Sequence, residues 1–565
     1  EQMLKAWQKL KRNVRSLHER IFFRPLLAAV STLSRDEVAL SDQAAQDRLA
    51  ALGYRDPRGA MRHIEALTNG VSRRAEIQRH LMPVLLGWFA EGVDADAGLL
   101  GFRLVSESLG TTSWYLRMLR DSPAAAERLC QILSSSRYIT DLLEDAPTSI
   151  TWLDKVADLQ PLSAGALKAE ITSLLSRHED SADAMRAVRY LRRREILRIA
   201  MGDALNLLSV QQVCTGLATV DECTIGAALA LAEREEINAG ERDEKTTPQK
   251  SDAPQRDSQE ATGEIPEDTQ QTPLLTEITV IAMGRLGGAE NGFGSDADVM
   301  FVHRPVEGAD EKEAQAQANR IVNRLMQLIK QPVRPAIRAE RPLEVDADLR
   351  PEGKQGALVR SLDSYRAYYE RWAETWEFQA LLRARPIAGS EDLGRAFVEL
   401  IDPYRYPREF TVEQAQQVRR MKARVEHERM PHGADRTRQL KLGRGGLSDV
   451  EWLVQLIQLQ HAHKVEGLRT TSTLEALDAA VQASLVADED AEVLRDAWLL
   501  ATKIRGGNVL RGVRQSDLLP TLRDALEAVA RWSGYTPGSA RQLEEDYLRV
   551  TRNARKVYER LFFEG

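Results

Sequence analysis

Two short apolar runs separated by a glycine-rich segment limit the fold of this 565-residue chain more than any other feature. Residues 278–283 and 299–302 are apolar and rich in side chains that favour strands, which predicts two buried strands. Residues 284–298, between them, contain five glycines. A small sheet of this kind, flanked by helical sequence, is typical of an α+β arrangement.

The glycine-rich segment suits the binding of phosphate groups. Glycines allow backbone N–H groups to turn toward an anion, and Gly294 is followed by Ser295, whose hydroxyl adds a hydrogen-bond donor. Asp296 and Asp298 lie two residues apart where the second strand begins, so both carboxylates point to one face. Two convergent carboxylates form a hard oxygen site suited to Mg²⁺.

A third carboxylate is expected on a neighbouring strand. Residues 343–350 alternate between apolar and polar side chains, and Glu344, Asp346 and Asp348 share the polar face. Burying such an acidic face is unfavourable unless cations neutralise it, and metal ions would do so. The pattern does not choose between Asp346 and Asp348. Each motif alone also fits an ordinary turn, a Ca²⁺ turn or a solvated loop, but their combination favours a catalytic site.

Helical periodicity dominates the rest of the chain. A helix is expected at 309–331, and beyond about residue 360 we expect helices to the C-terminus. Residues 238–273 contain no aromatic side chain and are dense in charged and polar residues, which predicts a disordered insertion. We therefore expect a mostly α protein with an α+β core. Its parts are a helical N-terminal region at 1–237, the insertion at 238–273, a catalytic domain at 274–400 and a C-terminal helical bundle at 401–565.

Charge and cysteine content exclude several classes of protein. The net charge is −7, from 84 acidic and 77 basic residues, which argues against a nucleic-acid binder. The three cysteines lack metal-ligand spacing, as is common in a reducing compartment. No apolar run approaches the ~20 residues of a membrane span, and no signal peptide is present. The sequence thus predicts a cytoplasmic protein that binds neither nucleic acid nor membrane.

The two ends of the chain resemble each other. Residues 12–23 and 552–563 align without a gap and share seven of twelve positions. Similar segments indicate duplication, although two amphipathic helix ends also match by chance. We expect the start of this chain to be the last helix of a preceding, related half.

The motifs resemble the polymerase-beta-like nucleotidyltransferase superfamily, whose signature is Gly-Ser, Asp-x-Asp and a later third Asp. They look more specifically like the glutamine synthetase adenylyltransferase family. The segments that carry this resemblance are 284–298, 344–351, 376–385 and 441–451. Members of that family have two halves, of which the N-terminal one removes AMP from glutamine synthetase by phosphorolysis and the C-terminal one attaches it to a tyrosine. The resemblance implies that this chain is the adenylylating half, with a polymerase-beta-like domain between helical flanks.

The resemblance also implies roles for individual residues. Asp346 becomes the third carboxylate, and Asp296 and Asp298 contact two Mg²⁺ ions while ATP serves as substrate. Gly294 and Ser295 would hold the phosphates. Arg285 and Arg350 are candidates for phosphate contacts or for surface ion pairs, and Lys441 is a further candidate near phosphate. Glutamine synthetase is the implied target, and a PII-type signal protein is a second expected partner.

Other interpretations of the whole chain remain open. The same carboxylates would serve phosphorolytic removal of AMP from the same target. A non-catalytic docking module is a different class, and the intact acidic set argues against it. Addition of nucleotides to RNA ends fits poorly with the acidic balance.

Several prominent side chains have structural interpretations. Ser448 and Glu451 have the spacing of a capping box at the start of an apolar helix. Trp372, Trp376 and Trp452 are candidates for stacking on adenine, but aromatic residues at helical spacing are more often core residues. His303, directly after the second strand, is expected to be structural.

Overall fold

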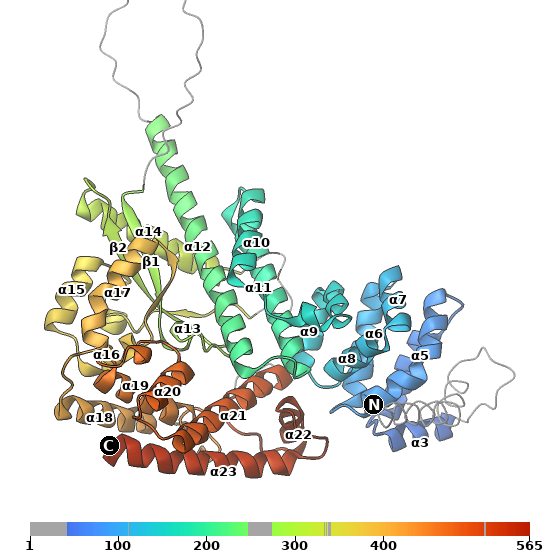
Figure 1. Cartoon of the computed structure of the whole chain (residues 1–565). Coiled ribbons are helices and arrows are strands. Elements are labelled where there is room, and N and C mark those ends of the chain that lie inside the picture. Colours follow the sequence, from blue (N-terminus) through green and yellow to red (C-terminus); the bar gives the residue numbers. More distant parts are fainter. Residues whose placement is uncertain are drawn as a thin grey trace, which may run out of the picture.

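The computed structural model describes residues 42–110, 112–246, 274–332, 334, 336, 341–512 and 516–564. Within these ranges the protein is mostly helical with one small mixed sheet, which confirms the expected fold class at that level. Figure 1 shows the sheet and the C-terminal helices on one side and the first helices extending on the other. Residues 12–23, which resemble the C-terminal end, lie outside the described residues.

The N-terminal region is helical wherever it is described. Its first helices are α3 (Asp42–Leu52), α4 (Pro57–Thr68), α5 (Arg73–Ala90), α6 (Ala95–Leu109), α7 (Ser113–Asp121), α8 (Pro123–Leu133) and α9 (Arg137–Asp145). Most begin at a residue whose side chain accepts a hydrogen bond from the backbone N–H three positions on, as Ser72 does for α5 and Asp94 for α6. Such caps satisfy amides that the helix itself leaves unpaired.

Three further helices connect this region to the sheet: α10 (Ala164–Arg177), α11 (Ser181–Ala204) and α12 (Val210–Thr246). By length and composition, Val210–Ala239 is long and apolar enough to cross a membrane, but 72% of its most apolar window is buried within the protein. It packs against α11, α14 and β5. Its composition is therefore that of a core helix.

The helix α12 corrects one sequence-based expectation. It continues to Thr246, so the expectation of disorder from residue 238 is wrong for residues 238–246. A segment without large apolar side chains cannot be buried, but it can still be helical. Charged residues such as Glu and Lys have a high helix propensity, so they allow α12 to continue. Residues 247–273 lie outside the described residues.

The sheet contains β1 (Thr276–Ala282), β2 (Ala297–Pro305), β3 (Val345–Asp346), β4 (Val359–Ser361) and β5 (Arg385–Gly389). The strand order is β3-β2-β1-β5, and β4 also pairs with β2. The central pair β1 and β2 is antiparallel, whereas β3 and β4 run parallel to β2. The two apolar runs at 278–283 and 299–302 thus form the centre of the sheet, as expected.

Helices cover both faces of the sheet. On one face, Val280 and Phe301 belong to the same buried cluster as Ile321 of α14 (Glu311–Lys330). On the other face, Ile281 belongs to a cluster that includes Phe397 of α17 (Glu391–Arg405). Because successive strand residues point to opposite faces, the central residues of β1 and β2 that lie between these helices are largely apolar. The helix expected at 309–331 is confirmed.

Two strand expectations are wrong. The acidic strand expected over 343–349 is only two residues long, because the Asp346 carboxylate accepts a hydrogen bond from the Asp348 N–H and the chain turns there. Asp residues favour such local turns over ladder pairing. The region beyond residue 360 is not helical throughout, since β5 pairs with β1 at the sheet edge. Its Pro386 suits an edge position and weakens the strand signal in the sequence.

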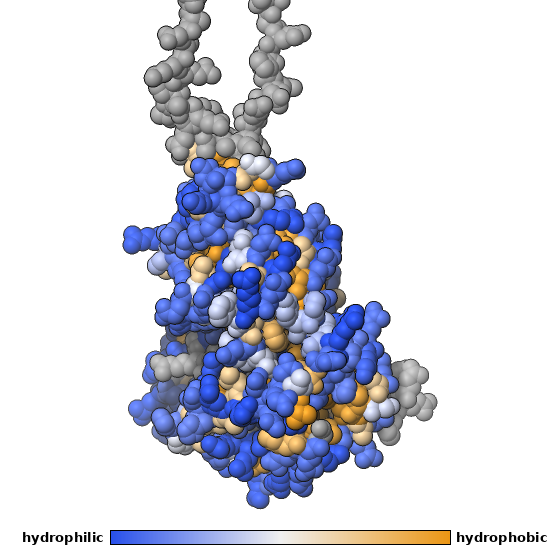
Figure 2. All heavy atoms as spheres, turned by 90° about the vertical axis from the view of Figure 1, so that its left-hand side faces the viewer, coloured by the Kyte–Doolittle hydropathy of each residue, from blue (hydrophilic) through white to orange (hydrophobic). Residues whose placement is uncertain are grey.

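The C-terminal helices form a separate buried cluster. The helices that follow β4 are α15 (Leu362–Arg371), α16 (Thr375–Leu381), α17, α18 (Val412–Arg429), α19 (Leu447–His461), α20 (Thr473–Gln482), α21 (Asp488–Gly512), α22 (Arg523–Trp532) and α23 (Ala540–Glu559). Figure 2 shows the face on the left of Figure 1, which is largely hydrophilic with apolar patches toward its lower part.

Candidate active site

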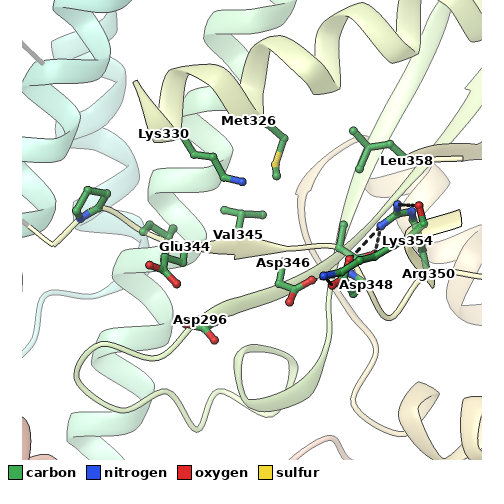
Figure 3. Close-up of a pocket in the computed structure, with 13 residues that line it drawn as sticks. Asp296, Met326, Lys330, Glu344, Val345, Asp346, Asp348, Arg350, Lys354 and Leu358 are labelled. Carbon is green, nitrogen blue, oxygen red and sulfur yellow. Dashed lines mark hydrogen bonds and ion pairs between the residues drawn. The ribbon is translucent and has the colours of Figure 1, made fainter. Parts of the chain in front are cut away.

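Asp298 and Asp346 lie side by side on adjacent strands. Asp298 is the second residue of β2, and its register partner on the parallel strand β3 is Asp346. Asp296 precedes β2 by one residue and lines a cavity of about 550 Å³ together with Asp346. Figure 3 shows both side chains in this cavity, with Lys330 of α14 and Glu344 nearby. The fold therefore brings the three acids to one edge of the sheet, from positions fifty residues apart in the chain.

The charges around Asp298 reflect this proximity. Its pKa is raised to about 6, chiefly because burial removes water from the carboxylate, and Asp346 and Asp296 add to the effect. Lys441 and Arg429 oppose it. Carboxylates this close together are unfavourable without a cation, so the site attracts positive charge.

The glycine-rich segment leaves room for the Asp298 carboxylate. Gly284 begins the single-turn helix α13 (Gly284–Gly287) at a φ of 53°, and a Cβ there would lie 2.2 Å from Asp298 Oδ2. Only glycine satisfies both the conformation and the space. The Met283 N–H donates to the Asp298 carbonyl at 2.8 Å, which fixes this turn against β2.

Gly294 and Ser295 directly precede Asp296 in the loop before β2. Gly294 has a φ of 72°, and the Ser295 hydroxyl accepts a hydrogen bond from the Gly292 N–H at 2.9 Å. That bond uses an oxygen lone pair and leaves the hydroxyl hydrogen to another acceptor. These residues and Asp296 line a second cavity of about 290 Å³, which adjoins the first at Asp296.

A buried network that sequence reasoning missed holds the loops of the site. Asp221 of α12 accepts hydrogen bonds from Arg192 Nε of α11 and from Asn291 Nδ2, each at 2.9 Å. Arg192 also donates to the carbonyl of Arg341 at 2.8 Å. Two helices thus fix the loop before β2 and the segment before β3. The residues are far apart in the chain, and no spacing in the sequence reveals them.

The two predicted arginines have structural partners. Arg285 donates to the Glu290 carbonyl at 2.8 Å and lies 3.8 Å from the Glu451 carboxylate. Arg350 donates to the Ala347 carbonyl at 2.7 Å and lines the larger cavity. Arg285 therefore joins the glycine-rich turn to the C-terminal helices, and Arg350 holds the turn that follows β3.

The motif residue Glu290 also connects the sheet to the C-terminal helices. Its carboxylate pairs with Arg383 at 2.8 Å, and it accepts a hydrogen bond from the Thr473 N–H at 2.6 Å. The Glu290 and Arg383 side chains are 6% and 7% exposed. A pair this buried is tolerated only because further hydrogen bonds satisfy both ions.

The positive charge of Lys441 lowers the pKa of Asp298 and so acts against the effect of burial. Lys441 begins the turn that leads into α19, and contacts with neighbouring helices hold this turn in place. The Gly445 N–H donates to Asp449 at 2.7 Å, and Asp449 in turn pairs with Lys422 at 2.8 Å. A Cβ on Gly445 would lie 1.9 Å from the Thr551 carbonyl, so α23 packs directly on the turn.

The capping box expected at Ser448 and Glu451 is wrong. Helix α19 begins at Leu447 with Gly446 as its N-cap, so Ser448 lies inside the first turn. Its hydroxyl accepts a hydrogen bond from Lys422 at 2.5 Å, and Glu451 faces Arg285. Both side chains therefore contact residues from distant parts of the chain, and not the backbone N–H groups that a capping box would use.

The remaining prominent side chains differ in their surroundings. His303 is buried, with one ring nitrogen bonded to Thr276 and the other to Gln315, so its structural role is confirmed. Trp452 packs against the C-terminal cluster, whereas Trp372 is 73% exposed and is not a core residue.

The donor set fits Mg²⁺ in its chemistry. Among the described residues, no group of three or more His, Cys, Asp or Glu side chains is placed so that it could hold a metal ion by itself. Mg²⁺ commonly takes only one or two carboxylates, and substrate phosphates and waters complete its shell. Adjacent Asp298 and Asp346 beside a glycine-lined cavity match that requirement.

Comparison with known proteins identifies the family. A family model described as glutamate-ammonia ligase adenylyltransferase matches residues 126–256 and 251–400, and one described as GlnD PII-uridylyltransferase matches residues 419–562.

Curated relatives match over the whole chain. A protein of Leifsonia xyli is 46% identical over 100% of this chain, one of Streptomyces avermitilis is 46% identical over 99%, and one of Mycobacterium tuberculosis is 43% identical over 98%. This chain covers 52%, 54% and 53% of these relatives, so it spans about half their length. All three are named bifunctional glutamine synthetase adenylyltransferase/adenylyl-removing enzyme, and this chain belongs to that family.

Proposed function

We propose that this chain transfers AMP from ATP to a tyrosine hydroxyl of glutamine synthetase and releases pyrophosphate. The observation that carries the proposal is the pairing of Asp298 with Asp346 beside a glycine-lined cavity. The names of the relatives supply the target and the reaction class. The central sheet, read together with the Gly-Ser and Asp-x-Asp motifs, supports assignment to the polymerase-beta-like nucleotidyltransferases.

The acids have distinct roles in this proposal. Asp296 and Asp298 would hold both Mg²⁺ ions, and Asp346 would hold the ion near the attacking oxygen. Bound Mg²⁺ would lower the pKa of the tyrosine, which is about 10 when free, and offset the charge of the triphosphate. The Gly294 backbone and the Ser295 hydroxyl hold phosphate oxygens, and Lys441 adds positive charge close to Asp298.

The chemical step is a displacement at phosphorus. The tyrosine oxygen attacks the α-phosphorus of ATP, the bond from that phosphorus to the bridging oxygen breaks, and pyrophosphate leaves with the electron pair. The Asp346 carboxylate accepts the phenol proton. A buried, preorganised site favours such a reaction because positioning supplies much of the rate enhancement.

Phosphorolytic removal of AMP is the second candidate, because the relatives' names include an adenylyl-removing activity that no comparison assigns to either half. It uses the same carboxylates with phosphate as the nucleophile. A PII-type signal protein is a further predicted partner, supported by the match of residues 419–562 to a GlnD-type model.

The test is a pair of incubations with the chain as it stands. Unmodified glutamine synthetase and ATP labelled at the α-phosphate should give labelled target, and adenylylated target with phosphate should give no ADP. The reverse result would favour removal over transfer. Activity in neither direction, with Mg²⁺ present, would instead support a docking module.

The variant Asp346→Asn should abolish transfer, whereas Asp348→Asn should retain most of it. Asp348 is the matched control because it lines the same cavity but pairs with Lys354 at 3.2 Å. Equal losses in the two variants would remove Asp346 from the assigned site.

A further inference from the structure

A cavity at the far end of the molecule from the sheet is lined by four arginines. It lies between α5 and α7, which pack against each other (Figure 1). Arg73 and Arg74 begin α5, and Arg117 and Arg120 lie on α7. The cavity has a volume of about 600 Å³, larger than the cavity at the candidate active site.

Few acidic side chains lie close enough to the four guanidinium groups to balance their positive charge. None of the described residues that line the cavity is an acid. Asp121 forms hydrogen bonds of 2.6 and 2.8 Å with Arg120, which lowers the Asp121 pKa. In the described parts of the chain, Arg73, Arg74 and Arg117 form no ion pair with an acid. Guanidinium groups that share a cavity concentrate positive charge there, and a bound anion would offset that charge.

The positions of Arg73 and Arg74 are unfavourable for helix stability. They occupy the first turn of α5, where the backbone N–H groups already carry partial positive charge. Acidic residues stabilise this position and basic residues destabilise it. The one acid of that turn, Glu76, does not line the cavity. Two arginines in this turn destabilise the helix itself, but they would stabilise an anion bound beside it.

The cavity also has apolar surface, because Ile77 and Leu116 line it. The combination of cationic and apolar walls is typical of sites for small organic ligands, whose cavities measure roughly 300–1,000 Å³.

We propose that this cavity binds a small organic anion that carries two or more phosphate or carboxylate groups. Arginine presents a planar fork of donors that matches both groups, and four such forks provide for more than one charged group. The site is separate from the candidate active site and does not depend on the proposed function.

Calorimetric titration of the whole chain tests the proposal. Pyrophosphate and citrate serve as probes for phosphate and carboxylate chemistry, with EDTA present to suppress metal-dependent binding and with ionic strength held constant by sodium chloride. We expect at least one probe to bind saturably at one site per chain. Binding of only one of them would identify which group the site prefers.

The double variant Arg74→Gln/Arg117→Gln should bind the probe at least roughly tenfold more weakly. Two control variants should bind it like the wild type. Arg58→Gln removes an exposed arginine of α4, and Lys441→Gln alters the candidate active site. Without a probe, the double variant should unfold at the same temperature as the wild type or at a higher one, because it lacks two repelling charges.

Three results would overturn the proposal. One is the absence of saturable binding of either probe to the wild type. Another is equal affinity in the wild type and the double variant. The third is a loss of binding in Lys441→Gln while the double variant binds like the wild type. This result would place the anion at the active site.

Discussion

Replacing Asp221 by Asn tests whether the N-terminal helices hold the active-site loops. The Asp221 and Arg192 side chains are 7% and 11% exposed, so the substitution leaves a nearly buried guanidinium without its counterion. Removing one partner of a buried pair costs about 3–5 kcal/mol. Asn can still accept one hydrogen bond, and Arg192 keeps its bond to the Arg341 carbonyl. We therefore expect the free energy of unfolding to fall by about 2–4 kcal/mol.

The same variant should lose activity beyond its loss of stability. The loop of Asn291, which leads to Asp296, would be held less firmly, and Arg192, which holds the segment before Asp346, would lose its counterion. A misplacement of about 1 Å at a reacting group can cost roughly 100-fold in rate. At a temperature where the variant stays folded, kcat for AMP transfer should therefore fall by roughly 10- to 100-fold.

Glu277→Gln is the matched control. It removes a 2.6 Å pair with Arg304 in the same sheet, but those side chains are 37% and 40% exposed. Such pairs contribute about 1 kcal/mol or less. Urea denaturation and steady-state kinetics should therefore separate the two variants. If Asp221→Asn matched Glu277→Gln in both assays, the network would have no positioning role.

Three further predictions concern stability. Lys422→Met should lower the unfolding free energy by about 3 kcal/mol in urea titration, since it leaves buried Asp449 without its 2.8 Å partner; an unchanged value would refute this. Gly445→Ala should lower the thermal midpoint, since φ is 69° and the new Cβ would meet the Thr551 carbonyl at 1.9 Å; a wild-type midpoint would contradict that packing. Burial raises the pKa of Glu233 from 4.5 to about 7, so the folded state binds more protons than the unfolded state between these values and stability falls as pH rises through them. Glu233→Gln should flatten that slope and stabilise the protein at pH 8 by up to about 3 kcal/mol, and parallel pH profiles would count against this.

The sequence predicted the elements whose signals are local. The apolar runs at 278–283 and 299–302 became β1 and β2, and the Asp-x-Asp spacing placed Asp298 on the second of them. Such signals survive in the fold because burial on both faces demands continuous apolar sequence. Pairing Asp346 with Asp298 required the family resemblance, because alternation alone favoured Asp348 equally.

Features set by tertiary contacts were beyond sequence reasoning. The capping box at Ser448 failed because Lys422, 26 positions away, takes the hydroxyl. The strand expected over 343–349 ended early because Asp346 bonds its own backbone neighbour. The Asp221 network joins residues from three distant segments, and no local pattern reports such a contact.

The central claim is that Asp298 and Asp346 hold a divalent cation together beside the glycine-rich loop. Titration of Mn²⁺ into the chain, with a non-hydrolysable ATP analogue present, measures this directly. We expect Asp346→Asn to weaken Mn²⁺ binding by roughly tenfold or more, and Asp348→Asn to leave it near the wild-type value. Wild-type affinity in Asp346→Asn, or an equal loss in both variants, would contradict the account.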